Sequence, residues 1–502
     1  MLAILPSSAA AAPVTVLGRD GRVSIRDDPF LTGQALTPAP AATPSSRIAR
    51  AAASSGGTGV NGGSGGDTSV KGGSGGSRRK RRRRARPEPT VRSELTRLLE
   101  SNAIDQAAYQ QYNGSFSAAL AAEKRLQGTR RAELTAVTET LHQIAVSKAF
   151  IPSRLPALFE TLDRNRQWWT TGPLLASGER VEFTGSQLVW EYYPGQGIQL
   201  QVLGSFGKAD GLYTGGPADY PAMEQLLSEL IPLASQRAGG LAWEYFFSFD
   251  GGSPPWTSAM SQATGLEALT RAYEATGNQY YLQVAAQALP LFSTAPPQGV
   301  GVPTPVGRRF IQYTFAPQTA IINAFLQTLI GLYDYARVSA NPVASLLFGA
   351  GNTEALAELP SYDTGAWSLY QPGVEDDLSY HQLVTGFLSQ LCTLTAAPLY
   401  CSTAAHFQSY LTTPPVLTQL TFRGRARKPI QLGFQLSKYS HVGITVSQGS
   451  STKFLTSANF PYGVGQFSIP ALKHPGAYSI VLSATDLAGN FARITGTLQV
   501  SR

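Results

Sequence analysis

The stretch "WTSAMSQATGLEALTRAYEATG", residues 256–277, decides the fold class of the largest part of the chain, because its apolar spacing is that of a packed helix. The same signal recurs on both sides of it, with loops rich in aromatic residues between the segments. The recurrences are residues 220–237, 278–292, 316–338, 341–360 and 379–395. Helix after helix between residues 217 and 412 predicts an α/α barrel or toroid, an architecture whose concave end commonly binds sugar polymers.

Upstream of this region the pattern changes twice. Residues 90–166 are rich in Ala, Leu, Glu and Arg, with apolar residues at helical spacing, and predict three or four helices. We expect Asn113-Gly114 and Gly128 to separate these helices. Residues 167–216 carry short runs of Val, Phe, Trp and Tyr cut by Gly and Pro, which predict a small β element.

Downstream, residues 415–502 change to an all-β pattern. Alternating apolar and polar residues form about seven short runs, as expected for an immunoglobulin-like β-sandwich. The run "AYSIVLSATDLAGNFA" predicts a closing hairpin with Gly489-Asn490 in its turn. Appended modules of this type usually serve as spacers or adhesion units.

The N-terminal region, residues 1–89, is low in complexity. It begins with "MLAILPSSAAAAP", an apolar and alanine-rich stretch that favours a signal remnant and export, and continues as a Gly/Ser-rich linker predicted to be disordered. The formal net charge of +8 is accounted for by the eight cations of "RRKRRRRAR", residues 78–86. The folded part is therefore neutral, which argues against a specific nucleic-acid partner; the basic block either adheres to an anionic polymer or is simply solvated.

Several chemistries are excluded by what the sequence lacks. It contains no nucleophile elbow, phosphate-binding loop or zinc-protease motif, and its five histidines show no metal-ligand spacing. We therefore predict no cofactor and no metal. No apolar run is long enough to cross a membrane. Cys392 and Cys401 either close one local disulfide or are small core residues.

What remains is a set of four tyrosine-rich clusters. The stretch "SYDTGAWSLYQPGVEDDLSYHQL", residues 361–383, is too irregular for a helix core and reads either as a loop or as the floor of an active site. The other clusters are "WEYYPGQGIQLQ" (190–201), "WEYFFSFDGGSPPWTSAMSQATG" (243–265) and "RRFIQYTFAP" (308–317).

At this point the sequence resembles a known family. The motifs "WTSAMSQATGLEALTRAYEATG", "INAFLQTLIGLYDYARV", "LPSYDTGAWSLY" and "SYHQL" look like the C-terminal catalytic domain of D-glucuronyl C5-epimerases, over about residues 190–395. These enzymes convert glucuronate to iduronate within heparan-type polymers. The resemblance implies a uronate-containing polysaccharide as partner, no cofactor, and an extracellular or cell-envelope location.

The resemblance also implies site residues. Inverting C5 requires a base on one face of the sugar and an acid on the other, and a tyrosine can serve if cations pull its pKa toward neutrality. The implied catalytic residues are Tyr313, Tyr362 and Tyr380. The implied substrate-binding residues are Tyr193, Gln196, Trp256, Ser258, Gln262, Arg308, Arg309, Gln312, Trp367, Tyr370 and His381.

One departure from the family pattern bears on catalysis. Animal enzymes carry a carboxylate immediately before the tyrosine of "QYTFAP", where this chain has Gln312, and Val384 stands where they have a second histidine. An amide cannot accept the proton, so three readings stay open. Another group such as Tyr362 or Glu375 acts as base, the protein only binds carbohydrate, or it acts on a different sugar.

Structural interpretations compete with several of these assignments. Tyr333 and Tyr335 fit a helix core, and His381 fits a hydrogen-bonded histidine at a helix start. The rings of Trp256, Trp367 and Tyr370 either pack or stack on sugar, and Arg308 and Arg309 either bind a carboxylate or lie on a loop. The leading hypothesis is a hexuronate C5-epimerase. The alternatives are a non-catalytic carbohydrate-binding or envelope protein, and a hydrolase or lyase that uses Glu375, Asp376 or Asp377.

Overall fold

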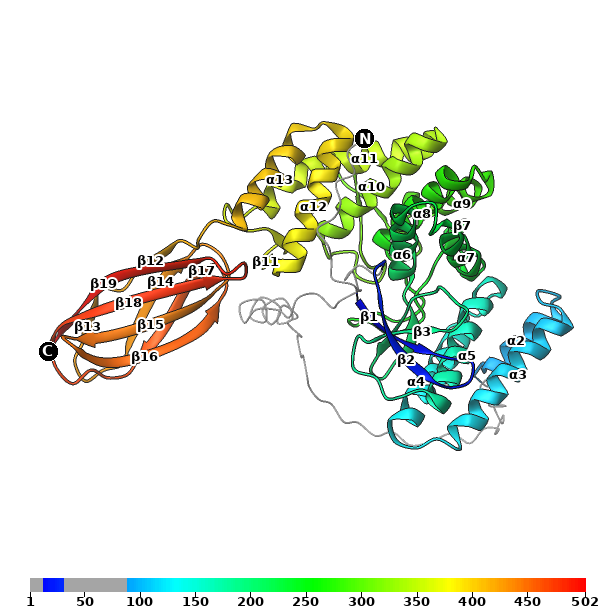
Figure 1. Ribbon diagram of the computed structural model, residues 1–502, viewed down its shortest axis with the longest axis horizontal. Coiled ribbons are helices and arrows are strands. Elements are labelled where there is room, and N and C mark those ends of the chain that lie inside the picture. The colour runs from blue at the N-terminus through cyan, green and yellow to red at the C-terminus, as the bar shows by residue number, and fades with distance from the viewer. Residues whose placement is uncertain (1–11, 31–87) are drawn as a thin grey trace, which may run out of the picture.

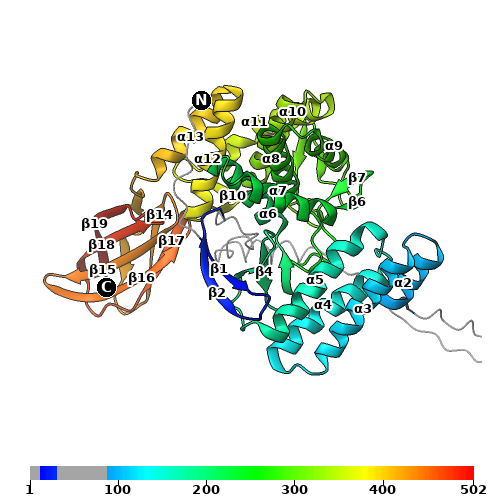
Figure 2. The same cartoon turned by 45° about the vertical axis from the view of Figure 1, so that its right-hand side comes forward.

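The computed structural model describes residues 12–30 and 88–502, which form a mainly helical body and a separate β-rich module at the C-terminus (Figure 1). Residues 1–11 of the expected signal remnant, and most of the expected linker with the arginine block, lie outside the described residues. A second view shows the C-terminal module next to α12 and α13 of the body (Figure 2).

The first helices of the body confirm the prediction of a helical N-terminal region. Thr90 caps α2 with a reciprocal capping box to Ser93. The predicted break at Asn113-Gly114 is wrong, because α3 runs through it; the chain breaks instead around Asp105, whose side chain caps α3. The last helix continues past the expected boundary at residue 166. The helices are α2 (Val91–Glu100), α3 (Gln106–Glu123), α4 (Gly128–Val146), the short η1 (Pro152–Arg154) and α5 (Leu155–Thr171).

A five-stranded sheet follows, and it corrects the expectation of disorder for residues 12–30. Its strand order is β2 (Val23–Asp28), β1 (Ala12–Leu17), β3 (Arg180–Phe183), β4 (Trp190–Tyr193) and β5 (Gly197–Leu200). Strand β1 pairs in parallel with β3, and all other neighbours are antiparallel. The N-terminal hairpin is held because it buries Val14 and Leu17, which are each 1% exposed.

A buried ion pair ties this hairpin to the helices. The ammonium of Lys208 lies 2.9 Å from a carboxylate oxygen of Asp28 and 2.9 Å from one of Glu182, and all three side chains are nearly fully buried. Arg26 also contacts Glu182. Three elements distant in sequence therefore depend on one another for charge compensation.

The helical region confirms all six segments predicted between residues 217 and 412. Helices α6, α8, α10 and α12 pack against one another in succession, and each packs against the helix that follows it in sequence. The helices are α6 (Val202–Gly215), α7 (Tyr220–Leu230), α8 (Ala259–Thr276), α9 (Gln279–Ser293), α10 (Ile322–Ser339), α11 (Pro342–Glu358), α12 (Leu378–Thr395) and α13 (Pro398–Tyr410). Sequence patterns missed α6 and α13: α6 contains several glycines, among them Gly211, which packs on Phe30 of the N-terminal segment.

Short hairpins connect these helices at the end where α8, α10 and α12 begin. Of the predicted site residues, they carry Arg308, Arg309 and Tyr370. The hairpins pair β6 (Ser235–Arg237) with β7 (Gly240–Ala242), β8 (Gly301–Pro303) with β9 (Arg308–Phe310), and β10 (Leu369–Gln371) with β11 (Val374–Glu375); the short helices η2 (Ile231–Leu233) and η3 (Leu359–Tyr362) lie between elements.

The two cysteines form a disulfide, which decides between the two alternatives left by the sequence. Cys392 and Cys401 bridge the end of α12 and the start of α13, with their Cα atoms 4.8 Å apart. Tyr335 is buried in α10, as expected for a core residue, and Tyr333 is partly buried.

The C-terminal module consists of two sheets around one hydrophobic core. The three-stranded sheet has the order β12-β14-β17, and the five-stranded sheet has the order β13-β19-β18-β15-β16. Buried residues from both sheets form a single cluster, since alternate residues along the strands face it. The predicted closing hairpin is confirmed as β18 and β19. The strands are β12 (Leu417–Gln419), β13 (Arg423–Arg425), β14 (Ile430–Leu436), β15 (Ser440–Gln448), β16 (Ser451–Phe460), β17 (Gly463–Ile469), β18 (Gly476–Asp486) and β19 (Phe491–Ser501).

Within residues 12–30 and 88–502, none of the helices combines the length and the apolar character needed to cross a membrane.

We predict that Lys208→Met destabilises the protein strongly. Removing the ammonium leaves Asp28 and Glu182 buried without full compensation, and such a loss costs about 3 kcal/mol of unfolding free energy, the lower end of the usual range because Arg26 remains. Chemical denaturation of the variant measures this. Lys124→Met, at an exposed lysine, is the control and should stay within about 0.5 kcal/mol of the parent. Equal effects of the two changes would contradict the structural role of Lys208.

Candidate functional site

The structure brings together three tyrosines from separate elements. Tyr313 lies just after β9, Tyr370 lies in β10 and Tyr380 lies in the first turn of α12. The rings of Tyr370 and Tyr380 meet edge to face with centroids 4.9 Å apart. Tyr313 lies close enough to both for their charges to influence one another. Two predicted catalytic residues, Tyr313 and Tyr380, thus meet around Tyr370, which was predicted to bind substrate.

Local backbone contacts fix these positions. The amide of Thr314 donates to the carbonyl of Thr257, and the amide of Ala259 donates to that of Ile311, so the segment that carries Tyr313 is pinned to the start of α8. Asp377 caps α12 by accepting the amide proton of Tyr380 at 2.9 Å. The cap therefore fixes the backbone of the residue whose side chain enters the cluster.

An aromatic wall backs Tyr313. Trp256 is 1% exposed and stacks on Tyr245 at 4.3 Å between ring centroids, while its indole N–H donates to the carbonyl of Phe247 at 2.7 Å. Tyr313 packs on Trp256 at 5.7 Å and on Phe315 at 5.2 Å. Of the two interpretations of Trp256, the structure supports the packing anchor, because the ring has no exposed face for a sugar.

The expected chemistry requires cations that lower the pKa values of the site tyrosines. The pKa values of Tyr313 and Tyr370 are instead raised. Burial raises the pKa of Tyr313 above its ordinary value, and the neighbouring Tyr380 raises it further. Burial likewise raises the pKa of Tyr370, to which Tyr313 and Tyr380 add. Both phenols are therefore held neutral in this structure.

Gln312 and two other predicted binding residues make hydrogen bonds next to Tyr313 and the start of α8. The hydroxyl of Ser258, the N-cap of α8, donates to the side-chain oxygen of Gln312 at 3.4 Å. Gln262 clamps Trp243, accepting from its amide at 3.0 Å and donating to its carbonyl at 2.8 Å. Gln312 is 5% exposed, and Ser258 and Gln262 are fully buried. Ser258 and Gln262 therefore serve the framework in this structure.

Tyr362 lies in a different cluster from the other predicted catalytic residues. It is 2% exposed, and its hydroxyl donates to the carbonyl of Ala320 at 3.1 Å. Its charged neighbours are Arg309 and Glu358, which form an ion pair at 2.7 Å from Nε to Oε1. Burial raises the pKa of Glu358 to about 7. Arg308 donates to the carbonyls of Ser293 and Gly301 at 3.2 and 3.3 Å, so both arginines have partners within the protein.

Beneath Tyr370 and Tyr380 lies a buried chain of polar groups. His381 is fully buried, stacks on Trp367 at 3.8 Å between ring centroids, and contacts the carbonyl of Phe407 through Nε2 at 2.9 Å. Its Nδ1 lies 2.7 Å from the hydroxyl of Ser368, which also contacts a carboxyl oxygen of Asp376. Trp367 and His381, predicted to bind substrate, are thus enclosed in the protein core.

The donors and acceptors of this chain determine where its protons lie. The carbonyl of Phe407 can only accept, so Nε2 of His381 carries the proton. Nδ1 is then an acceptor, and the backbone amide of Ser368 donates to it at 3.3 Å. The hydroxyl of Ser368 donates to a carboxyl oxygen of Asp376 and lies 2.7 Å from Nδ1. Burial raises the pKa of Asp376 to about 8 and lowers the pKa of His381 to about 4, which favours the neutral form of both groups.

The first tyrosine cluster approaches the site from the sheet. Tyr193 packs on Phe247 with ring centroids 4.6 Å apart and accepts from the side chain of Gln201 at 2.8 Å. Gln196 accepts from the amide of Ser248 at 3.0 Å. The turn between them is held by Glu133, which accepts from the amides of Gly195 and Gly197. These contacts join β4 and β5 to the aromatic wall.

Sequence reasoning missed two residues here. Tyr245 contacts both Trp256 and the Tyr193 region, and the alternation of Trp243, Tyr245, Phe247 and Phe249 on one face was a signal for it. Glu191, 3% exposed, lies beside Tyr193; burial raises its pKa, although Arg180 opposes this. No spacing rule indicated that Glu191 points inward.

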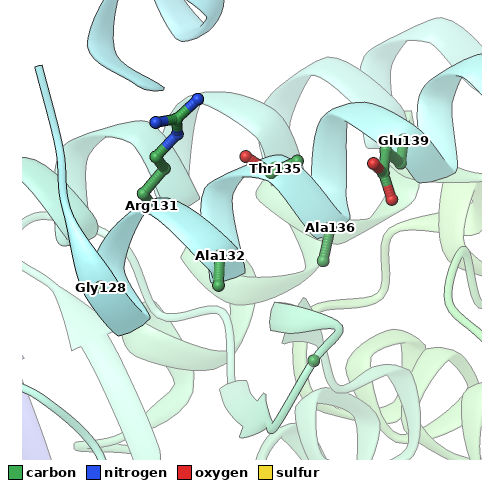
Figure 3. Close-up of a pocket in the computed structure, with 7 residues that line it drawn as sticks. Gly128, Arg131, Ala132, Thr135, Ala136 and Glu139 are labelled. Carbon is green, nitrogen blue, oxygen red and sulfur yellow. The ribbon is translucent and has the colours of Figure 1, made fainter. Parts of the chain in front are cut away.

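A shallow hollow of about 410 Å³ lies beside the turn that contains Gly195 (Figure 3). It lies along α4, and its walls are small or exposed polar side chains. The lining residues are Gly128, Arg131, Ala132, Thr135, Ala136, Glu139 and Gly195. Among the residues that the structure describes, no cluster of three or more histidine, cysteine, aspartate or glutamate side chains could hold a metal ion.

Part of the chain is similar to known proteins. Residues 238–409 match the model of the family "D-glucuronyl C5-epimerase C-terminus". The D-glucuronyl C5-epimerase of Caenorhabditis elegans is 33% identical over 130 residues, which are 23% of this chain and 21% of that protein. An uncharacterised protein of Methanocaldococcus jannaschii is 29% identical over 137 residues, 26% of this chain and 44% of that protein. The chain therefore spans less than half the length of these relatives.

Solved structures give weaker matches. A sugar epimerase from a ruminal bacterium has a TM-score of 0.31 and 12% identity, covering 42% of this chain and 58% of that one. Cellobiose 2-epimerase from Bacillus thermoamylovorans has a TM-score of 0.30 and 15% identity, covering 41% and 57%. At these scores the likeness does not establish a shared fold.

We predict that Asp376→Asn leaves the protein folded, whereas Asp376→Ala destabilises it. The asparagine side chain keeps an oxygen that can accept from Ser368, and alanine removes it. The folded pKa of Asp376, about 8, lies above its unfolded value of about 3.9. The native state of the parent therefore binds the extra proton between these limits, and its stability should fall relative to Asp376→Asn as pH rises from about 4 to 8.

Denaturation of both proteins across this pH range measures the difference. His381 is present in both, so its own titration largely cancels. A stability difference that does not change with pH would show that Asp376 is ionised in the folded protein.

Proposed function

We propose that this protein is a carbohydrate epimerase that inverts C5 of a hexuronate within a polysaccharide, because residues 238–409 match the model of the D-glucuronyl C5-epimerase C-terminus family. The observation that carries the proposal is the meeting of Tyr313, Tyr370 and Tyr380 inside the matched segment. Glucuronate-to-iduronate conversion in a heparan-like polymer is the reaction we favour.

The chemistry asks for one proton to leave C5 and another to arrive on the opposite face. Tyr380 is the member of the cluster with partial exposure, so it is our candidate to touch the sugar. Tyr313 and Tyr370 stand behind it as neutral phenols that can donate hydrogen bonds to charge developing on the substrate carboxylate. Tyr193 and Gln196 border the same region from β4 and the turn after it.

We assign other roles to the remaining residues that the sequence predicted for the site. Trp256, Ser258, Gln262, Trp367 and His381 hold the framework, since each is buried and engaged. Arg309 and Tyr362 form a neighbouring cluster with Glu358. A base for the first proton transfer is not identified, because Gln312 replaces the carboxylate expected in animal enzymes.

Gln312 favours a second candidate function, a carbohydrate-binding or cell-envelope protein without turnover. The third candidate, a hydrolase or lyase using the three adjacent acids, has less support. Glu375 and Asp376 are buried, and Asp377 caps α12. Each carboxyl group already has partners within the protein.

We also propose a wider architecture and a location for the protein. The succession of α6, α8, α10 and α12, each backed by the next helix, supports an α/α toroid. Two sheets around one core support an immunoglobulin-like module. The disulfide between Cys392 and Cys401 supports an oxidising compartment, and thus export. The division of the chain near residues 89, 166, 216 and 412 is also a proposal.

We predict that the protein incorporates solvent deuterium at C5 of a uronate polymer, and that Tyr380→Phe lowers the rate about 100-fold or more, as loss of a general acid or base does. Nuclear magnetic resonance of glucuronate-containing polymers incubated in D₂O measures this. Tyr280→Phe, at a tyrosine 50% exposed on α9, is the control and should retain the rate.

The outcomes separate the candidate functions. Absence of exchange on every uronate polymer would overturn the epimerase proposal, and binding to such a polymer without exchange would select the carbohydrate-binding protein. Exchange that survives Tyr380→Phe unchanged would remove Tyr380 from the mechanism.

A further inference from the structure

The carboxylate of Glu375 joins the C-terminal module to the helical body. One oxygen accepts the amide proton of Tyr439 and the other that of Tyr462, each at 2.9 Å. Tyr439 lies between β14 and β15, and Tyr462 between β16 and β17, so one side chain holds two loops of the module. Glu375 is 8% exposed, and hydrogen bonds to an ionised, buried acceptor are strong.

Lys438 makes a second contact at the same junction. Its ammonium lies 2.7 Å from a carboxylate oxygen of Asp486, donates to the carbonyls of Tyr410 and Thr413, and lies 5.2 Å from the ring centroid of Trp367. The side chains of Lys438 and Asp486 are each 1% exposed. A buried pair with this many partners holds a fixed geometry, since displacing either charge would leave the other uncompensated.

The residues next to Glu375 face the candidate site. Asp376 accepts from the hydroxyl of Ser368, which also contacts His381, and the backbone amide of Asp376 donates to the carbonyl of Ser368 at 3.1 Å. Asp377 caps α12 at Tyr380. Three consecutive acids therefore contact, in order, the C-terminal module, the β10–β11 hairpin with α12, and the backbone of a site tyrosine.

We propose that the C-terminal module is a positioning part of the site, acting through Glu375 on the hairpin that carries Tyr370 and on the start of α12 that carries Tyr380. A spacer or adhesion unit, which the sequence favoured, would be joined by an exposed and solvated linker. Here the connecting residues 412–414 are exposed, but the contacts of Glu375 and Lys438 beside them are buried and charged. Asp376 and Asp377 extend these contacts to Ser368 and to the backbone of Tyr380. The catalytic consequence of this proposal rests on the proposed function, whereas its structural consequence does not.

Hydrogen exchange of the full chain tests the coupling. In Glu375→Gln, the amide group can no longer accept from both backbone donors, so we expect the amides of Tyr439 and Tyr462 to exchange about tenfold faster, equivalent to about 1.4 kcal/mol. The amides of residues 368–379 should accelerate by a similar factor, because the hairpin loses its hold. Glu375→Asp, which keeps the charge but is one methylene shorter, gives the same test if the glutamine variant does not fold.

The matched control is Val446→Ala, in the core of the module and away from the junction. It should lower the melting temperature of the module while residues 368–379 exchange at the parental rate. Faster exchange at Tyr439 and Tyr462 in Glu375→Gln, with residues 368–379 unchanged, would overturn the proposal and leave the module as a spacer. Unchanged exchange throughout the variant would overturn it as well.

Measurements of kcat and KM distinguish a positioning role from simple destabilisation. On a polymer that shows C5 exchange, Glu375→Gln should lower kcat about tenfold and change KM less than twofold, and Val446→Ala should change neither below its melting temperature. If the parent protein exchanges no polymer, the proposed function fails, but hydrogen exchange still decides whether the module positions the tyrosines.

Discussion

The hydrogen bond from Ser368 to Asp376 is the interaction on which the candidate site depends. It completes a chain through His381 to the carbonyl of Phe407, and so joins β10, the acidic segment, α12 and α13. Ser368, His381 and the carbonyl of Phe407 are joined by hydrogen bonds within the core, while the second carboxyl oxygen of Asp376 is buried without a partner among the residues that the structure describes. Tyr370 and Tyr380 lie on the elements that this chain aligns. Because the chain is buried, water cannot replace a missing partner, and the alignment has few alternatives.

The site as a whole is built from uncharged polar groups set among aromatic rings. Tyr313, Tyr370, Gln312, His381 and Asp376 are all neutral when the histidine and the acid keep the protonation that burial favours. In such surroundings a carboxylate at position 312 would need a compensating cation, since a lone buried charge is expensive. The amide at this position is thus consistent with its neighbours, and the charge for catalysis would have to come with the substrate.

Sequence reasoning located the helical body and the C-terminal sheets because apolar periodicity records which face of each element is buried. It failed where contacts between residues far apart in the sequence determine the local structure. Glycines in α6 argued against a helix, yet Gly211 is needed where Phe30 approaches. The hairpin of β1 and β2 went unseen because its partner β3 lies far along the chain. Family resemblance found Tyr313 and Tyr380, but no pattern could show that Tyr362 turns toward Arg309, or that Glu191 and Asp376 are buried.

The parallel pairing of β1 with β3 also constrains the order of events during synthesis. Residues 15–17 find their partners only when residues 181–183 have been made. At ribosomal speeds of about 5–20 residues per second, the N-terminal strand waits on the order of ten seconds with apolar side chains unpaired. Strand β2 can cover one edge of β1 during this time, and the other edge stays open to pairing with other chains until β3 has been made.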